Sequence, residues 1–416
     1  MQLNLSNITH KYDQLRYNFL LFLICSIPLF YILGSFYINF ILLVCVFCLF
    51  FFPKNQLRNY LKNSTIFICI FVFFLLINSL LSVDKIYTFY KSFGYIRFLL
   101  YALFILITFD LLKKENLKWI GLFLLIFNIF VALDTIYQFI FDIDLLGNAV
   151  NYKHAYGRLS GPFGTEYIVG IYLFCFGTAS IFFINKFFNV NKFINFFLFL
   201  FFFITIFLTG ERNAFLTVLI FLFFLFLINK NTRFLILSTF ICLIISCYVI
   251  ISSSNILKNK YNFLNLPTFS SSDIQATKSN NLEKNSNIKN SIKLNNEKNE
   301  NENKFNNFSY KIEKIKIIFL NNLWFAHYRA GFFIFKDNIF IGTGVKSFRE
   351  ECLNVMNYDG VVCTTHPHNM YVELLSDTGL IGLTIFIFSL YKIIKIFIKK
   401  KFYNNFAYSI ILAMNF

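Results

Sequence analysis

The strongest constraint on this chain is a series of apolar stretches that recurs along its whole length. Each stretch has about 18 residues or more, and a helix of that length crosses a bilayer core of roughly 30 Å. Of the 416 residues, 57% are hydrophobic and only 14% are charged, whereas soluble domains have about 25% charged residues. The sequence therefore predicts an all-α polytopic membrane protein.

The apolar stretches also predict how often the chain crosses the membrane. The first of them, Tyr17 to Gly34, lacks the small-residue cleavage site of a signal peptide and is followed at once by a second stretch, so we interpret it as a span. In all, the pattern predicts about eleven spans, at residues 17–34, 35–52, 64–83, 95–112, 119–141, 167–185, 192–209, 214–229, 234–251, 369–391 and 403–416.

Basic residues predict the orientation of these spans. The net charge of +17 arises mainly from Lys and Arg in short connections, which argues against a nucleic-acid-binding surface. With the N-terminus in the cytoplasm, the basic clusters beside short connections fall on one side, as the positive-inside rule requires. These clusters are Lys54, Arg58 and Lys62; Lys113, Lys114 and Lys118; Lys186 and Lys192; Lys230 and Arg233; and Lys399, Lys400 and Lys401.

Three segments fall on the opposite face. They are a loop at about 142–166, the tight turn TGERNAF and a long segment at 252–368. Within the long segment, residues 270–304 are rich in Asn, Lys, Ser and Glu, and such a composition predicts a disordered insertion. Further on, the stretch NNLWFAHYRAGFFIFKDN predicts an amphipathic helix at the membrane surface.

These segments define the predicted domain organisation. Residues 1–251 form an N-terminal transmembrane bundle of about nine helices, residues 252–368 form the large outer loop, and residues 369–416 form the C-terminal transmembrane helices.

The nine cysteines fall into two groups. Seven lie in or beside apolar spans; they include the CVFC of Cys45 and Cys48, which we interpret as small apolar residues because no polar partners surround them. Cys352 and Cys363 lie instead in the ordered part of the outer loop. In an oxidising compartment this pair is a candidate disulfide.

Three arginines on the outer face are candidates for binding an anion. Arg158 lies in GRLSGPFGTE, Arg212 in TGERNAFL and Arg329 in AHYRAGFF. A cation at membrane depth costs about 2.5–3.5 kcal/mol on insertion scales, so it usually has an anionic partner. The structural alternative for Arg212 is an ion pair with Glu211 or contact with lipid phosphate. The functional interpretation is a site for phosphate or pyrophosphate, which guanidinium groups bind through two parallel hydrogen bonds.

The stretch THPHNMYVELLSDTGLIGL introduces the span at 369–391. His368 is either a helix-entry residue followed by the capping residue Asn369, or a general base at the boundary between water and membrane. An imidazole with an ordinary pKa near 6.5 suits proton removal at neutral pH. Gly379 and Gly382 would allow other helices to pack closely against this span.

Two further interpretations of polar residues remain open. His366 and His368 are separated by one residue and lack a further well-spaced ligand, so a metal site completed by Glu350, Glu351 or Asp359 is the weaker alternative. Asp134 and Gln138 are four residues apart on one helix face. A carboxylate inside the membrane is often functional, but a structural hydrogen-bonded pair explains the same spacing.

Two of these stretches resemble the O-antigen ligase family and its relatives, the O-antigen polymerases and the bacterial protein O-oligosaccharyltransferases. HNMYVELLSDTGLIG has His-Asn, nine residues, Gly, two residues and Gly, and RNAFL has Arg, three residues and Leu. GRLSGPFGTE and HYRAGFFIFKDNIFIGTGVKSF are also similar to outer segments of this superfamily, so the resemblance covers roughly residues 120–390.

The resemblance implies a C-type glycosyltransferase-like enzyme of about twelve helices in the bacterial inner membrane, with a large periplasmic loop and a periplasmic active site. It would move a glycan from undecaprenyl pyrophosphate to the lipid A–core oligosaccharide, without metal or other cofactor. By motif position, His368 would be the base, Arg212 and Arg329 would bind pyrophosphate, and Arg158 matches less firmly. The Asn/Lys-rich insertion and the eleven rather than twelve spans depart from the family pattern.

The alternatives differ in what receives the glycan. A polymerase uses the same donor to join repeat units, and a protein O-oligosaccharyltransferase glycosylates a protein. A lipid-linked glycan transporter would also place arginines near a pyrophosphate, but it needs a path that connects both sides of the membrane. The candidate residues here lie on one side only.

Overall fold

The computed structural model describes residues 5–52, 54–112, 114–150, 158–188, 190–228, 232–253, 323–358 and 360–399. The predicted insertion at 270–304 and the last predicted span at 403–416 lie outside the described residues. Within the described residues the chain is helical and has no strand apart from an isolated bridge between Ile143 and Ala149.

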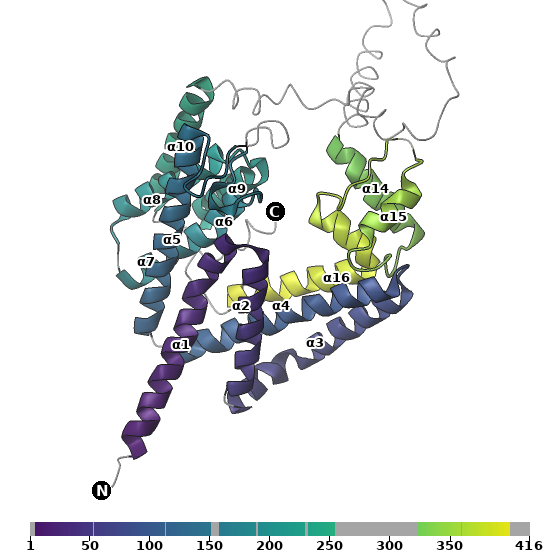
Figure 1. The fold of residues 1–416 in the computed structure, drawn as a ribbon, viewed down its shortest axis with the longest axis horizontal. Coiled ribbons are helices and arrows are strands. Elements are labelled where there is room, and N and C mark those ends of the chain that lie inside the picture. Colours follow the sequence, from purple (N-terminus) through teal and green to yellow (C-terminus); the bar gives the residue numbers. More distant parts are fainter. Residues whose placement is uncertain are drawn as a thin grey trace, which may run out of the picture. The chain divides into compact units, whose positions relative to one another are not determined.

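Most of the described helices are long (Figure 1). In chain order they are α1 Leu5–Leu33, α2 Ser35–Cys48, α3 Lys54–Leu81, α4 Lys85–Leu111, α5 Lys114–Phe141, α6 Val169–Tyr172, α7 Thr178–Phe188, α8 Lys192–Leu208, α9 Arg212–Ile228, α10 Arg233–Ser253, α14 Leu323–Asp337, α15 Phe348–Val355 and α16 Met370–Lys399.

Six of these helical stretches are long and apolar enough to cross a membrane: Gln14–Leu33, Lys85–Phe109, Asn116–Phe141, Val169–Phe188, Arg233–Ser252 and Met370–Tyr391. Four shorter apolar helices accompany them, at Ser35–Phe51, Ile68–Leu81, Lys192–Leu208 and Arg212–Ile228. The prediction of an all-α polytopic membrane protein is therefore confirmed.

Several helices extend beyond the apolar stretches that predicted them. α1, α3 and α4 begin at Leu5, Lys54 and Lys85, about ten residues before the predicted spans, because a helical backbone continues into polar residues where hydropathy no longer marks it. The span predicted at 167–185 consists of α6, a π-helical turn at Leu173–Gly177 and α7.

The chain forms two compact units. The first contains residues 1–66, 95–262 and 392–416, and the second contains residues 67–94 and 263–391. α3, α4 and α16 therefore each contribute residues to both units.

Aromatic packing forms the core of the first unit. One buried cluster links the helices from α5 through α10 and includes Phe174, Phe203 and Phe221. A second links α1, α2, α4 and α5 around Phe104 and Ile107. A Cβ at Gly121 would lie 2.7 Å from Phe183 Cβ, so this glycine allows α5 and α7 to pack closely.

In the second unit, α16 is broken at Gly379. This residue has φ 63° and ψ −165°, a conformation that favours glycine. The break releases backbone groups, and Leu380 and Ile381 donate their amides to the carbonyls of Ile339 and Phe340 (2.9 and 3.1 Å). The sequence predicted close helix packing at Gly379, whereas the structure uses it to interrupt the helix because the 339–346 loop packs against it.

The side chain of Asn78 joins α3 to this break. Its amide donates to the carbonyls of Ile341 and Asp377, and its oxygen accepts from the amide of Val345. Asp377 in turn accepts from the amide of Lys346 at 2.8 Å. Irregular backbone at membrane depth is tolerated where protein groups satisfy it in this way.

Candidate active site

The predicted site residues are divided between the two units. His366, His368, Asn369 and Arg329 lie in the second unit, and Arg158, Arg212, Asp134 and Gln138 lie in the first. Each group is therefore described within its own unit.

His368 lies immediately before α16 in an uncommon backbone conformation. Its φ is 55°, a left-handed value that non-glycine residues adopt only when their surroundings enforce it. Asn369 follows as the N-cap of α16, because its side-chain oxygen accepts from the amides of Tyr371 and Val372 (2.9 and 3.1 Å). Pro367 is buried while His368 is exposed, so the backbone is anchored and the imidazole can reach solvent or a ligand.

A second histidine, His327, lies next to His368. It is 3% exposed on α14, and the two ring centroids are 5.1 Å apart. The Nδ1 of His327 is 2.9 Å from the carbonyl of Val362. A carbonyl oxygen only accepts, so Nδ1 carries the proton and Nε2 keeps its lone pair in the neutral ring. Burial lowers the pKa of His327, and the nearby His366 lowers it further.

Gly331 allows α14 to approach α16 closely beside the two histidines. A Cβ at Gly331 would overlap the side chain of Val372 in α16. Gly331 and His327 are four residues apart and share one face of α14. Packing therefore explains the glycine of the AHYRAG stretch. His327 lies on the same face of α14 as that contact.

His366 also lies next to His368. Their ring centroids are 4.2 Å apart, and the Nδ1 of His366 is 2.9 Å from the hydroxyl of Thr365. The proposed acidic ligands do not join these rings: among the described residues, no group of three or more His, Cys, Asp or Glu is arranged to hold a metal. Asp359 lies outside the described residues.

Arg329 projects from α14 two residues after His327. Its guanidinium lies against the backbone of Gly360, where a Cβ would overlap Nη1, and its Nε donates to the carbonyl of Phe325 (3.4 Å). Burial lowers the pKa of Arg329, but a guanidinium stays charged at neutral pH. Arg329 is therefore a partly desolvated cation that lies beside the backbone of Gly360.

A disulfide stabilises the backbone between these groups. Cys352 of α15 and Cys363 are bonded, with Cα atoms 5.5 Å apart. Cys352 packs with Ala330 and Ile334 of α14 in a small core, and α14 and α15 lie side by side (Figure 1). Because Cys363 follows Val362, the disulfide restrains the carbonyl that sets the tautomer of His327.

In the first unit, Arg212 begins α9 after a tight turn. Gly210 has φ 70°, and Glu211 accepts from the amide of Gly170 through its Oε1 at 2.7 Å. The amide of Leu159, the residue after Arg158, donates to the carbonyl of Thr209 (3.2 Å). The structure therefore brings the backbone of Arg158 to the turn that precedes Arg212.

Asp134 and Gln138 are both buried and act on the loop that follows α5. Asp134 accepts from the amide of Leu145 (2.8 Å), and Gln138 accepts from the amide of Gly161 (2.8 Å). Gln138 also donates to the carbonyl of Asn148 (3.2 Å). This bonding favours the structural interpretation, in which both side chains hold the 142–166 loop against α5.

His327 is not among the site residues that the sequence predicts. Its signal was a lone histidine on the apolar face of the predicted amphipathic helix, one turn before a glycine. That pattern alone is more typical of a satisfied core histidine, and only the tertiary structure places its ring beside that of His368.

Comparisons with known proteins bear on the family of this chain. The O-antigen ligase family model matches residues 197–387, a range that includes Arg212, Arg329 and His368. No curated protein and no solved structure matched the chain. The match supports a membrane enzyme of the O-antigen ligase type that acts on a lipid-linked glycan. Residues 197–387 are similar to the O-antigen ligase family, and the match supports that family for this chain.

Proposed function

We propose that this protein transfers a glycan from undecaprenyl pyrophosphate to the lipid A–core oligosaccharide, at a periplasmic site in the bacterial inner membrane and without a metal. The observation that carries the proposal is the exposed His368, held in a left-handed backbone conformation by the cap of α16 and next to a buried neutral histidine. The disulfide supports a periplasmic location, since such bonds persist in oxidising compartments.

In the proposed reaction, His368 acts as general base. It removes the proton from a hydroxyl of the acceptor sugar as the oxygen forms a bond to the anomeric carbon of the donor. The bond from that carbon to the pyrophosphate oxygen breaks, and the electron pair leaves with undecaprenyl pyrophosphate. An anionic leaving group of this kind needs fixed positive charge rather than a general acid.

His327 would support this role through its charge state. A base must be neutral before it accepts a proton, and a charged neighbour at this ring separation would oppose protonation of His368. Because burial lowers the pKa of His327, this ring stays neutral and does not repel the imidazolium that forms on His368.

Arg329, Arg212 and Arg158 would bind the pyrophosphate. The guanidinium of Arg329 is partly desolvated beside Gly360, and ionic hydrogen bonds are stronger where water is excluded. Asn369 has a supporting role, since its side chain fixes the start of α16 and thereby the backbone of His368.

A reconstituted transfer assay tests the proposal. Purified full-length protein is mixed with undecaprenyl-pyrophosphate glycan and lipid A–core, with and without a chelator. We expect transfer that resists the chelator, falls by at least about 100-fold in His368→Gln and remains substantial in the matched control His366→Gln.

Other outcomes would redirect the assignment. Chain extension of the donor in place of transfer would identify a polymerase. Inhibition by the chelator, together with equal losses in the two histidine variants, would support a metal site. Full activity of a folded His368→Gln protein would remove His368 from the base role.

A further inference from the structure

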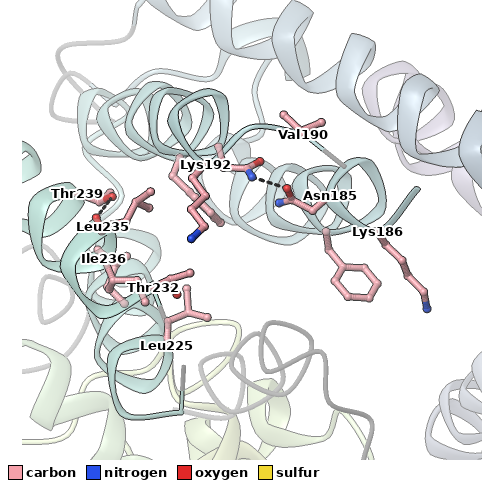
Figure 2. A pocket seen from close by; sticks show the side chains of 13 residues that line it. Asn185, Lys186, Val190, Lys192, Leu225, Thr232, Leu235, Ile236 and Thr239 are labelled. Atoms are coloured by element: carbon pink, nitrogen blue, oxygen red, sulfur yellow. Dashed lines mark hydrogen bonds between the residues drawn. The ribbon is translucent and has the colours of Figure 1, made fainter. Parts of the chain in front are cut away.

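A cavity lies in the first unit, where the ends of four helices meet. It has a volume of about 340 Å³ and lies among the C-terminal ends of α7 and α9 and the N-terminal ends of α8 and α10 (Figure 2). Small-molecule sites typically have volumes of about 300–1,000 Å³. The connections at these helix ends carry Lys186, Lys192 and Arg233, so the positive-inside rule predicts that the cavity opens on the cytoplasmic side.

The charge of this cavity has one sign. Its lining includes Lys186 and Lys192 and, among the described residues, no Asp or Glu. The side chain of Lys192 extends into the space, whereas that of Lys186 points away from it (Figure 2) and lies over the rings of Phe182 and Phe187. In the part of the chain that the structure describes, no hydrogen bond or ion pair occupies the ammonium of Lys192.

Arg233 does not supply a second cation to the cavity. Its guanidinium donates to the carbonyls of Phe226 and Leu227 at the end of α9 (3.0 and 3.3 Å). It therefore satisfies backbone acceptors at the end of α9. Lys192 remains as the cation directed into the space.

An amide pair provides a hydrogen-bond acceptor beside Lys192. The Nδ2 of Asn195 donates to the Oδ1 of Asn185 (Figure 2). The Oδ1 of Asn195 is buried and has no hydrogen-bond partner among the described residues. Buried polar atoms are nearly always hydrogen-bonded, so this oxygen lacks a donor, and a small rotation of the side chain would bring it to the cavity that Asn195 lines.

The rest of the cavity wall is apolar. Phe199, Leu222 and Leu225 are buried residues of α8 and α9 that line it. The cavity thus combines a cation, an amide acceptor and a hydrocarbon wall. An inorganic anion would use only the first, whereas an amphiphile with a charged and hydroxylated headgroup would use all three.

We propose that this cavity binds the headgroup of an anionic glycerophospholipid from the cytoplasmic leaflet. The phosphate pairs with Lys192, a headgroup hydroxyl donates to the Oδ1 of Asn195, and the first carbons of a chain lie against Phe199 and Leu225. Phosphatidylglycerol fits these requirements, because it carries net negative charge and hydroxyl donors. Phosphatidylcholine has neither. Basic pockets between helices on the cytoplasmic side are suited to such headgroups.

Native mass spectrometry of the full-length protein in detergent tests this site. Equimolar phosphatidylglycerol and phosphatidylcholine are added to wild type, Lys192→Gln, Lys192→Arg and Lys118→Gln. Lys118 is an exposed lysine of α5 in another connection of the same predicted face and does not line the cavity, so it controls for a general charge effect.

We expect wild type to retain one phosphatidylglycerol in preference to phosphatidylcholine. Lys192→Gln should reduce this retention by about tenfold, the effect of losing one charge-assisted hydrogen bond. Lys192→Arg and Lys118→Gln should retain it, and Asn195→Ala should weaken it by several-fold.

Three outcomes would overturn the proposal. One is equal retention of the two lipids by wild type, and another is an equal loss in Lys192→Gln and Lys118→Gln. The third is complete displacement of phosphatidylglycerol by excess inorganic phosphate, which would identify a simple anion site instead. None of these measurements depends on the proposed transfer reaction.

Discussion

At the residue scale, the charge state of two neighbouring imidazoles defines the candidate site. His327 is buried and donates through Nδ1 to a carbonyl, whereas His368 is exposed at a capped helix start. The same residue type therefore has two environments: burial favours the neutral ring of His327, whereas the ring of His368 is exposed.

The lowered pKa of His327 predicts how stability depends on pH. The unfolded chain binds a proton near pH 6.5, whereas folded His327 binds it only at lower pH. The free energy of unfolding should therefore fall as pH decreases through about 6.5. His327→Gln keeps a donor for Val362 but cannot titrate, so it should flatten this dependence. Thermal midpoints in detergent between pH 5.5 and 7.5 measure the effect, and identical slopes for both proteins would contradict it.

A substitution at Gly360 tests the proposed role of Arg329. A Cβ at Gly360 would overlap the guanidinium, so Gly360→Ala should displace it and lower transfer by about tenfold or more. Gly164→Ala is the matched control, because Gly164 also has positive φ (65°) but has no other atom within 4 Å of its Cβ position. Alanine is strained at these positive φ values, at a cost of about 1–3 kcal/mol at either site. If both variants lose transfer equally, backbone strain rather than Arg329 explains the loss.

At the element scale, the broken helix α16 is the feature that most depends on long-range contacts. Its break at Gly379 is satisfied by the 339–346 loop, and Asn78 of α3 bonds to both partners of that contact. An interrupted span is stable here only because the three segments together satisfy its released backbone groups.

The break in α16 predicts that Gly379 does not tolerate substitution. A Cβ at Gly379 would lie 2.5 Å from the carbonyl of Phe340, and φ is 63°. Gly379→Ala should destabilise the protein by about 2–4 kcal/mol through strain and overpacking. Gly94→Ala in α4, where no other atom lies within 4 Å, should be neutral or stabilising. The yield of monodisperse protein in detergent and its thermal midpoint report both effects; equal yields would refute the prediction.

At the scale of the whole molecule, the proposed function requires that the histidines and arginines of both units face one side of the membrane. The positive-inside rule predicts this arrangement, because most of the basic connections fall on the opposite side. The family match, which includes residues of both units, is consistent with a shared role for them.

Cysteine labelling tests this sidedness. In a Cys69→Ser background, Asn213→Cys and Thr365→Cys should react with a membrane-impermeant maleimide added to cells with a permeabilised outer membrane. Lys118→Cys should react only after the inner membrane is disrupted. All three positions are exposed. Opposite labelling of Asn213→Cys and Thr365→Cys would exclude a single site on one face.

The sequence alone determined the properties that depend on local composition. Apolar length predicted the helical membrane class, the amphipathic pattern predicted a helix where α14 lies, and the HNMYVELLSDTGLIG motif indicated the family. The His-Asn pair also indicated a capped helix start, because capping depends on only a few consecutive residues.

Only the tertiary structure decided the properties that depend on contacts between distant residues. The ring of His327 reaches His368 across 41 positions in the sequence, and Asn78 bonds to Asp377 across 299. Hydrophobic periodicity carries no information about such pairs. The interruption of α16, the loop-binding role of Asp134 and Gln138, and the cavity beside Lys192 therefore became visible only in the folded chain, where packing determines which polar groups meet.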